Sequence, residues 1–284
     1  MTRKIYVVDQ NVMRSPRFAE FVDAHPNAKF VIPDTGLVEM VKNEHWEDTF
    51  RNSFEAFVPL VTRCFMAMSI QEARELEIRS RASAEGRLLP SIFTELLRGA
   101  IVESQIGSGQ TMSLLRDRMA EAREDLQRHD LNVEANRDEL KRLVGKLRAE
   151  LSEDGIKACR QGGIAGRIAR LGIARAVGDG FYVAHMKKAG VPNSVSRRLW
   201  KTKSLTRRWC YVQVHHALQW LGDGGLDTAK GKVVLNDILD QDYVLLGSAF
   251  DGVLSLETDV RKALEDLQFM LSLPPSAHAP VIVR

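Results

Sequence analysis

Residues 236–257 read NDILDQDYVLLGSAFDGVLSLE, and this stretch decides the fold that we predict for the chain. Three carboxylates stand within residues 237–242, an apolar run follows, and Asp251-Gly252 precedes a short apolar segment that ends in Glu257. The order is typical of a helix, a tight turn, a short buried strand and an acid where the chain leaves that strand. Functional groups of open α/β sheets gather at the carboxyl ends of the strands, so the stretch predicts a site as well as a fold.

Two runs near the N-terminus repeat this arrangement. Residues 4–8 are mostly β-branched or aromatic and are followed by Asp9, while residues 29–32 form a second apolar run, followed by a helix that carries Glu39. Acids at strand ends and on adjacent helices can converge into one anionic pocket. Such a pocket is costly without cations, and hard divalent metals are its natural occupants.

Strands alternate with helices over the first eighty or so residues, with a third strand expected at 64–68. This alternation of strands and helices predicts an α/β fold with a parallel sheet flanked by helices. Helices are expected at 11–24 and 46–60, and a final edge strand at 281–283.

The order of the acids resembles that of the PIN-domain nucleases, which combine a strand-end Asp, a helical Glu, a later helical Asp and a fourth acid in a Thr/Ser-x-Asp pattern. The matching positions in this chain are Asp9, Glu39, Asp240 and the acid of Ser255-Leu256-Glu257. The resemblance covers about the first eighty residues and the last fifty. It departs from the family in having Glu257 where an Asp is usual, and in a long helical segment between the second and third acids.

Three acids compete for the third position of this pattern, namely Asp237, Asp240 and Asp242. Asp237 and Asp240 are three residues apart and share one face of a helix, whereas periodicity does not settle Asp242. The distance from Asp240 to the turn at 251–252 fits the family best, so Asp240 is favoured.

The resemblance implies a divalent-metal-dependent nuclease with Mg²⁺ or Mn²⁺ as its cofactor. The implied metal ligands are Asp9, Glu39, Asp237, Asp240 and Glu257, of which all but Asp237 form the catalytic set. Asn11 and Ser255 are expected to contact these carboxylates, a metal-bound water or a phosphate. Family members usually hydrolyse single-stranded RNA to leave a 5′ phosphate and a 3′ hydroxyl, and they often act as toxins, in defence or in RNA turnover.

Each acid also has an ordinary structural explanation. Asp9 can cap a strand end, Glu39 can lie on a solvated helix face, and Asp237 and Asp240 can favour a helix start through the macrodipole. Singly these explanations are preferred, whereas the four acids in this order favour the metal site. Two further functions stay open: a structure-specific deoxyribonuclease, and a catalytically weak scaffold that binds nucleic acid or a protein partner.

The middle of the chain predicts a large helical insertion at 86–231, between α/β segments at 1–85 and 232–284. Residues 111–152 contain no proline and only one glycine, so they predict one helix roughly 60 Å long at ~1.5 Å per residue. A heptad seam runs along it through Leu115, Met119, Ala122, Leu126, His129, Val133, Asn136, Leu140, Leu143 and Leu147. The seam predicts coiled-coil packing, with helices of the same chain favoured over a homodimer or a protein partner.

A long helix at 194–221 follows an expected turn at 178–180. Its first half is basic without any acid and carries Arg197, Arg198, Lys201, Lys203, Arg207 and Arg208. These side chains predict contacts to the phosphates of nucleic acid, and Trp200 or Trp209 is a candidate to stack on an unpaired base. The alternative is a solvated helix face with both tryptophans in the core.

Composition sets the remaining expectations. The 284 residues are 44% hydrophobic and 27% charged with a net charge of +3, as in a soluble globular protein whose basic surfaces are local. The apolar runs are too short to span a bilayer. Three scattered cysteines without metal-ligand spacing predict reduced thiols and a cytoplasmic location.

Overall fold

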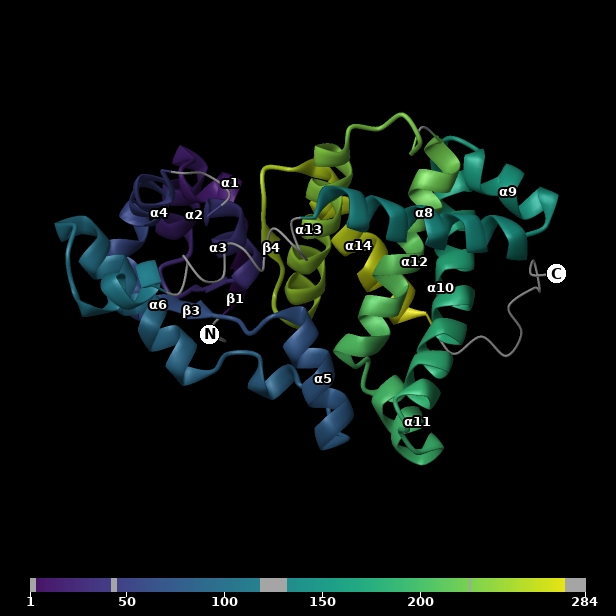
Figure 1. Ribbon diagram of the computed structural model, residues 1–284, viewed down its shortest axis with the longest axis horizontal. Coiled ribbons are helices and arrows are strands. Elements are labelled where there is room, and N and C mark those ends of the chain that lie inside the picture. The colour runs from purple at the N-terminus through teal and green to yellow at the C-terminus, as the bar shows by residue number, and fades with distance from the viewer. Residues whose placement is uncertain (1–3, 42–44, 118–131, 225, 274–284) are drawn as a thin grey trace. The chain divides into compact units, whose positions relative to one another are not determined.

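The computed structural model describes residues 4–41, 45–117, 132–224 and 226–273 and divides the chain into two compact units (Figure 1). Unit 1 comprises Met1–Ala73, Glu85–Asn132 and Asp242–Leu264, and unit 2 comprises Arg74–Ala84, Val133–Gln241 and Glu265–Arg284. These boundaries differ from the expected ones, because much of the predicted insertion before Val133 belongs to the unit that holds the sheet. The predicted edge strand at 281–283 lies outside the described residues.

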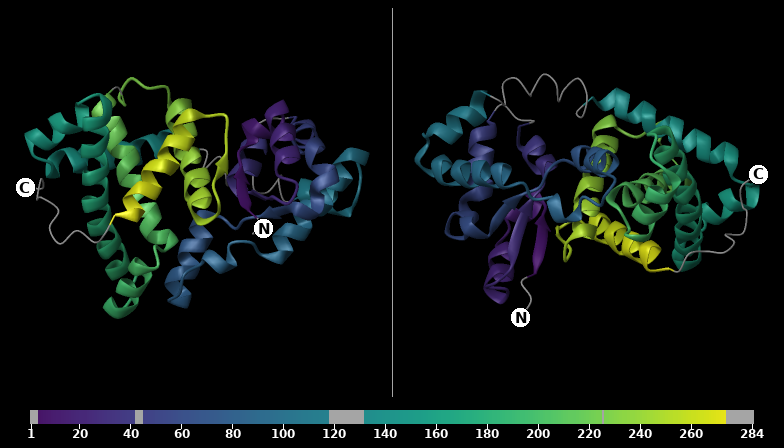
Figure 2. Two further views of the ribbon diagram at one scale, coloured as in Figure 1. Left: turned by 180° about the vertical axis from the view of Figure 1, so that it is seen from behind. Right: turned by 90° about the horizontal axis from the view of Figure 1, so that it is seen from below.

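Unit 1 holds a four-stranded parallel sheet in the order β3-β2-β1-β4, whose strands lie side by side in the right-hand view of Figure 2. The strands are β1 (Ile5–Val8), β2 (Lys29–Ile32), β3 (Cys64–Met66) and β4 (Val253–Leu254). β1 pairs with both β2 and β4, with Tyr6 opposite Phe30 and Val8 opposite Leu254. The parallel sheet flanked by helices is therefore confirmed, and β1, one of its two inner strands, ends directly before Asp9.

The helices of unit 1 build an apolar core against the sheet. They are α1 (Gln10–Met13), α2 (Pro16–Ala24), α3 (Asp34–Val41), α4 (Trp46–Phe54), the 3₁₀ segment η1 (Glu55–Arg63), the start of α5 (Ile70–Ser80), the 3₁₀ turn η2 (Glu85–Arg87) and α6 (Ser91–Ile106). Residues 110–117 are also helical, and α13 and α14 contribute their unit 1 parts, as described below. Phe18, Phe30 and Phe57 are almost completely buried, and their rings contact one another.

Two helices predicted for unit 1 are shorter than expected. The helix at 11–24 breaks at Arg14–Ser15, because Ser15 caps α2 and Pro16, which lacks an N–H, is suited to the first helical position. The helix at 46–60 ends at Phe54 and continues as η1, which contains Pro59.

Unit 2 is built from helices. It contains the end of α5 together with α8 (Val133–Glu150), α9 (Glu153–Arg160), α10 (Gly163–Lys188), α11 (Asn193–Lys201), α12 (Leu205–Asp223), most of α13 (Gly231–Ala249) up to Gln241 and the end of α14 (Thr258–Ser272). α12 packs against α10, α8 and α9, and α9 also packs against α10. Among the described residues, no helix has the length and apolarity that a membrane crossing requires.

The turn predicted at 178–180 is wrong, because these residues lie inside α10. A Cβ atom added at Gly178 would lie 2.6 Å from Cδ1 of Tyr211 on α12. The glycine therefore permits close packing of two helices, and the glycine-aspartate-glycine pattern does not mark a turn here.

The single helix predicted at 111–152 is also wrong, because Asn132 is not helical and α8 begins at Val133. Residues 118–131 of that prediction, including His129, lie outside the described residues. Two members of the seam, Leu140 and Leu147, are buried within the chain, and α8 packs against α12. This part of the seam thus serves intrachain packing, the favoured alternative.

The helix predicted at 194–221 is two helices. α11 ends at Lys201, Lys203 has a φ of 53°, and the side chain of Ser204 accepts the N–H of Arg207 to cap α12. A left-handed residue followed by a serine cap ends one helix and begins the next, so the basic stretch is divided between two helices.

Replacing Gly178 by Ala is expected to lower the free energy of unfolding by about 1–3 kcal/mol, because the new methyl group overlaps the Tyr211 ring. Urea denaturation followed by circular dichroism measures the change. The matched control is Gly172→Ala in the same helix, where an added Cβ meets nothing within 4 Å and a gain of about 0.5–1 kcal/mol is expected. Equal effects at both positions would contradict the close helix packing.

Candidate acidic site

Parallel pairing places the acid after β1 beside the residue after β4. Val8 lies opposite Leu254, and the N–H of Asp9 donates to the Leu254 carbonyl at 2.9 Å. The hydroxyl of Ser255 then donates to Asp9 Oδ2 at 2.5 Å, and the backbone N–H of Asn11 donates to Oδ1 at 3.2 Å. Asp9 is only 4% exposed, so a carboxylate is held inside the protein at the end of the central strand.

Asn11 and Ser255 also hold Glu257. The side-chain amide of Asn11 donates to Glu257 Oε1 at 3.2 Å, while its oxygen accepts the N–H of Leu256 at 3.0 Å. The hydroxyl of Ser255 accepts the N–H of Glu257 at 3.0 Å. Each of these two polar side chains therefore touches both strand-end segments, and together they connect the carboxylates of Asp9 and Glu257.

Hydrogen bonds between α3 and α13 hold a second pair of acids, Glu39 and Asp242, in unit 1. Tyr243 Oη donates to Glu39 Oε2 at 2.8 Å, and Thr35 Oγ1 donates to Asp242 Oδ2 at 2.5 Å. Thr35 and Glu39 are one helical turn apart on α3 and share a face. Gly36 lies between them, where a Cβ atom would be 3.3 Å from the Tyr243 hydroxyl, so the absence of a side chain lets the phenol approach α3.

Burial raises the pKa of Asp9 above its ordinary value, and the hydrogen bonds from Ser255 and Asn11 offset only part of that effect. The negative charge of Glu257 raises it further. Burial likewise raises the pKa of Tyr243, and the charges of Glu39 and Asp9 add to the effect. The phenol therefore stays protonated and acts as a hydrogen-bond donor close to both carboxylates.

Unit 1 thus holds two hydrogen-bonded groups of acids. Ser255 and Asn11 bind Asp9 and Glu257, while Tyr243 and Thr35 bind Glu39 and Asp242. Of the three acids that compete for the third position, Asp242 belongs to this unit. Asp237 and Asp240 belong to unit 2, where Asp237 Oδ2 is 3.9 Å from Nε2 of His216. Asp242 contacts α3 through Thr35, while the choice among the three acids stays a prediction.

Tyr243 and Thr35 were not identified from the sequence. Their only local signal is that Tyr243 follows Asp242 in the acidic stretch and that Thr35 stands one turn before Glu39. Their role depends on which faces of α3 and α13 meet, and that pairing joins positions more than two hundred residues apart.

The donor set of the acidic site consists of oxygen atoms, which suits Mg²⁺ or Mn²⁺. Among the residues that the structure describes, however, no three His, Cys, Asp or Glu side chains are arranged to hold a metal ion. Neutral donors contact the four carboxylates, namely two hydroxyls, a phenol and an amide. The residues therefore fit a hard cation in chemical type, while binding would require the carboxylates to move closer together.

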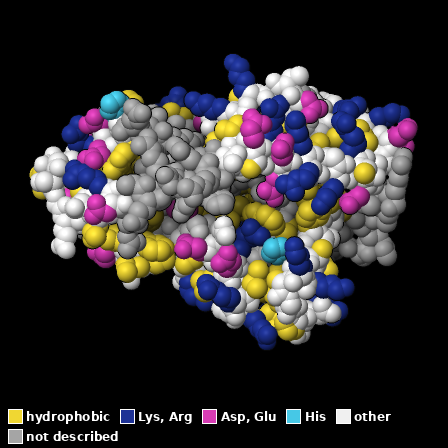
Figure 3. Space-filling view, in the orientation of Figure 1, with side chains coloured by type: hydrophobic (Ala, Val, Ile, Leu, Met, Phe, Trp, Pro, Cys, Tyr) yellow, Lys and Arg dark blue, Asp and Glu magenta, His cyan; other side chains and the backbone are white. Residues whose placement is uncertain are grey.

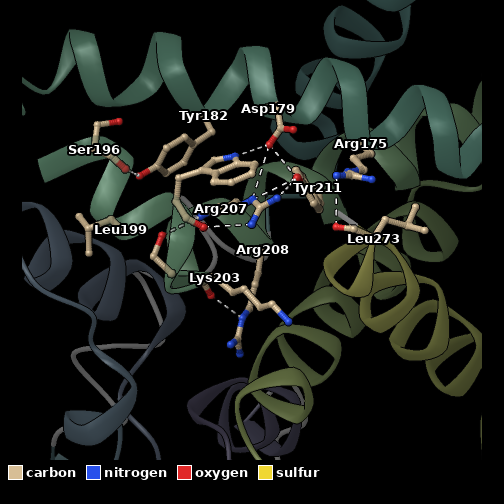
Figure 4. A network of polar contacts seen from close by, with 12 residues as sticks. Arg175, Asp179, Tyr182, Ser196, Leu199, Lys203, Arg207, Arg208, Tyr211 and Leu273 are labelled. Carbon is tan, nitrogen blue, oxygen red and sulfur yellow. Dashed lines mark hydrogen bonds and ion pairs between the residues drawn. The ribbon is translucent and has the colours of Figure 1, made fainter. Parts of the chain in front are cut away.

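Two of the six residues predicted to contact nucleic acid, Arg207 and Arg208, are buried, so that part of the prediction is wrong. Figure 4 shows their polar contacts. The Arg207 guanidinium lies 3.8 Å over the Trp200 ring and donates to Tyr211 Oη at 2.6 Å, with Asp179 at 3.5 Å. Arg208 is 5% exposed and donates to the Lys203 carbonyl at 2.8 Å. Arg197, Arg198, Lys201 and Lys203 are exposed.

Both tryptophans of this region are engaged within the protein. The Trp200 indole N–H donates to Asp179 at 2.7 Å, and the Arg74 guanidinium lies 3.4 Å over the Trp209 ring. Their rings pack against the buried cluster around Tyr182 and Leu199. The core alternative therefore describes them better than stacking on a base.

Comparison with known protein families, with curated proteins and with solved structures finds no match to this chain. The interpretation of the acidic site therefore rests on its geometry and on the residue pattern.

The raised pKa of Asp9 leads to a prediction about stability. An acid whose pKa is higher in the folded than in the unfolded state destabilises the fold. The cost is absent below the unfolded pKa, grows between the two pKa values and is complete above the folded pKa. Asp9→Asn keeps the acceptor oxygen and removes the charge. We expect the variant, without added metal, to melt higher than the parent at neutral pH.

Calorimetry between mildly acidic and neutral pH measures this difference, which should shrink as the pH falls. Asp251→Asn is the control, because Asp251 accepts the N–H of Ile5 at the opposite ends of the same strands and has an exposed environment. A lower melting temperature of Asp9→Asn at neutral pH would contradict the cost of burying this charge.

Proposed function

We propose that the chain is a divalent-metal-dependent endoribonuclease of PIN type, which hydrolyses RNA phosphodiester bonds. The observation that carries the proposal is the buried Asp9 carboxylate at the end of the central strand, connected through Ser255 and Asn11 to Glu257. These residues are those of the D-x-N and S-x-E patterns at the two ends of the chain. A cation would remove the electrostatic cost that raises the pKa of Asp9.

In this proposal Asp9, Glu39, Asp242 and Glu257 hold Mg²⁺ or Mn²⁺. Asp242 replaces Asp240 because it lies in unit 1 and contacts α3, the helix that carries Glu39. A bound divalent ion would lower the pKa of a coordinated water and neutralise the charge that develops on the phosphate. Tyr243, Asn11 and Ser255 orient the carboxylates through hydrogen bonds, a contribution that is often worth 10–100-fold in affinity or activity.

A role as a toxin or defence effector would follow from the resemblance to PIN nucleases, and a cytoplasmic location would suit an enzyme that acts on RNA. The products expected from that resemblance are a 5′ phosphate and a 3′ hydroxyl.

Asp9→Asn and Glu39→Gln are expected to lower RNA cleavage at least about a hundredfold, because each removes a charged ligand and keeps the side-chain shape. Cleavage of end-labelled RNA in the presence of Mn²⁺ measures the effect, and circular dichroism verifies the fold. Asp251→Asn serves as the control with unchanged cleavage. Full activity of both ligand variants would contradict the assigned site.

A second candidate function is a scaffold that binds a partner without catalysis. The observation in its favour is that the described carboxylates already accept hydrogen bonds from neutral groups and include no ready metal-binding group.

The response to Mn²⁺ separates the two functions. A site that binds the ion in the folded state gains about 2.7 kcal/mol at a hundred times Kd, so the melting temperature should rise with Mn²⁺ concentration. The rise should be lost in Asp9→Asn and retained in Tyr182→Phe, a control that removes a hydroxyl which donates to the Ser196 carbonyl in unit 2. A melting temperature that does not change with Mn²⁺ concentration would favour the scaffold.

A further inference from the structure

Four segments of unit 2 meet around one small apolar cluster. The buried members come from the end of α10, from α11 and from the start of α12, and include Tyr182, Met186, Leu199 and Cys210. Ile78, near the end of α5, packs against the same cluster. Arg198 Nη2 also donates to the carbonyl of Arg81 at 2.7 Å, which joins α11 to the turn after α5.

Exposed cations surround this cluster, and we call them the basic pole. Its members are Arg79, Arg81, Lys187, Lys188, Arg197, Arg198, Lys201 and Lys203. Within the part of the chain that the structure describes, none of the eight forms an ion pair with a carboxylate. Figure 3 shows Lys and Arg side chains in the lower part of the view, where Figure 1 places α11.

Few acidic side chains lie on the elements that carry the basic pole. Glu75 is exposed on α5, one helical turn before Arg79. Residues 180–222 contain no Asp or Glu. Glu77 is fully buried and accepts the N–H groups of Leu205 and Thr206 at 3.0 and 2.9 Å, so its charge faces the first turn of α12. Asp179 accepts from Tyr211 and lies 3.5 Å from Arg207, as Figure 4 shows, and it also accepts from Trp200. The local excess of positive charge is therefore large, although the chain as a whole carries only +3.

The surroundings of the cations indicate which polyanion fits. In the described segments 74–84 and 181–208, one large hydrophobic side chain is strongly exposed, namely Val183 on α10, and the two tryptophans are held by Arg74, Arg207 and Asp179. A membrane surface is usually bound with an apolar anchor, and single strands are bound with exposed aromatic rings. The basic pole offers one isolated valine and no strongly exposed aromatic ring among the described residues, so its chemistry matches phosphates whose bases are turned inward.

We propose that the basic pole of unit 2 binds the phosphate backbone of double-stranded nucleic acid, with RNA duplexes as the first case, and without reading its sequence. The proposal extends beyond phosphodiester cleavage and depends only on unit 2, so it stands or falls separately from the acidic site. The hydrogen bond from Arg198 to the Arg81 carbonyl holds α11 and the turn after α5 together before binding, which limits the entropic cost of ordering these segments.

Binding through phosphates makes affinity depend on salt. Each duplex phosphate neutralised contributes about −0.9 to the slope of log K against log salt concentration. The triple variant Lys187→Glu, Arg197→Glu, Lys201→Glu reverses the charge of three exposed residues on α10 and α11. These three side chains make no hydrogen bond within the described part of unit 2, so their replacement leaves its internal contacts intact. We expect its slope to be smaller in magnitude by about 3 and its affinity at moderate salt to be lower by at least about tenfold.

Fluorescence anisotropy tests this with a short random-sequence RNA duplex and a single strand of equal length, in EDTA so that no metal-dependent cleavage intervenes. The matched control is Lys146→Glu, Arg148→Glu, Arg160→Glu, which makes the same charge change at exposed positions of α8 and α9. The expected result is tight duplex binding by the parent and the control, and weak binding by the pole variant. Circular dichroism verifies that both variants are folded.

Four results would overturn the proposal. They are absence of duplex binding by the parent, an equal loss in the control variant, tighter binding of the single strand than of the duplex, and binding to vesicles containing phosphatidylserine that outcompetes the duplex. Because EDTA is present throughout, a failed nuclease assay leaves the outcome of this test unchanged.

Discussion

The pairing of β1 with β4 is the constraint on which the rest of unit 1 depends. It places Val8 opposite Leu254 and so brings Asp9 to Ser255, across 246 residues of chain. A shift of one residue in this register would turn Ser255 away from Asp9, because successive side chains of a strand point to opposite faces. The short strand β4, with only two residues, therefore determines where the carboxylates of both chain ends meet.

The two units differ in how the charge of a buried carboxylate is compensated. In unit 1 the Asp9 carboxylate is held by a hydroxyl and a backbone N–H, which leave its pKa raised. In unit 2 the charges are compensated, as where Asp266 accepts from Arg167 at 2.7 Å and contacts His215 at 3.1 Å, and these partners lower its pKa despite burial. An acid left at an electrostatic cost is a candidate for function, whereas a fully paired acid is better explained by stability.

Arginine has two roles in unit 2. Arg207 lies between an aromatic ring and hydrogen-bond acceptors inside the unit, where its flat guanidinium both stacks and donates. Arg197, on α11, is exposed to solvent. Packing of the interior by Arg207 is what fixes α11 and α12 relative to each other, and this in turn fixes the spacing of the exposed cations.

Local pattern in the sequence determined the parallel strands, the acids that follow them and the run from 180 to 222 that lacks any acid. Periodicity and turn signals act over a few residues, so a sequence shows them directly. Only the tertiary structure decided that Arg207 and Arg208 point inward, that Gly178 lies within a helix, and that Tyr243 and Asp242 contact α3. These outcomes depend on which helix faces meet, and the partners lie far away along the chain, where no local pattern specifies them.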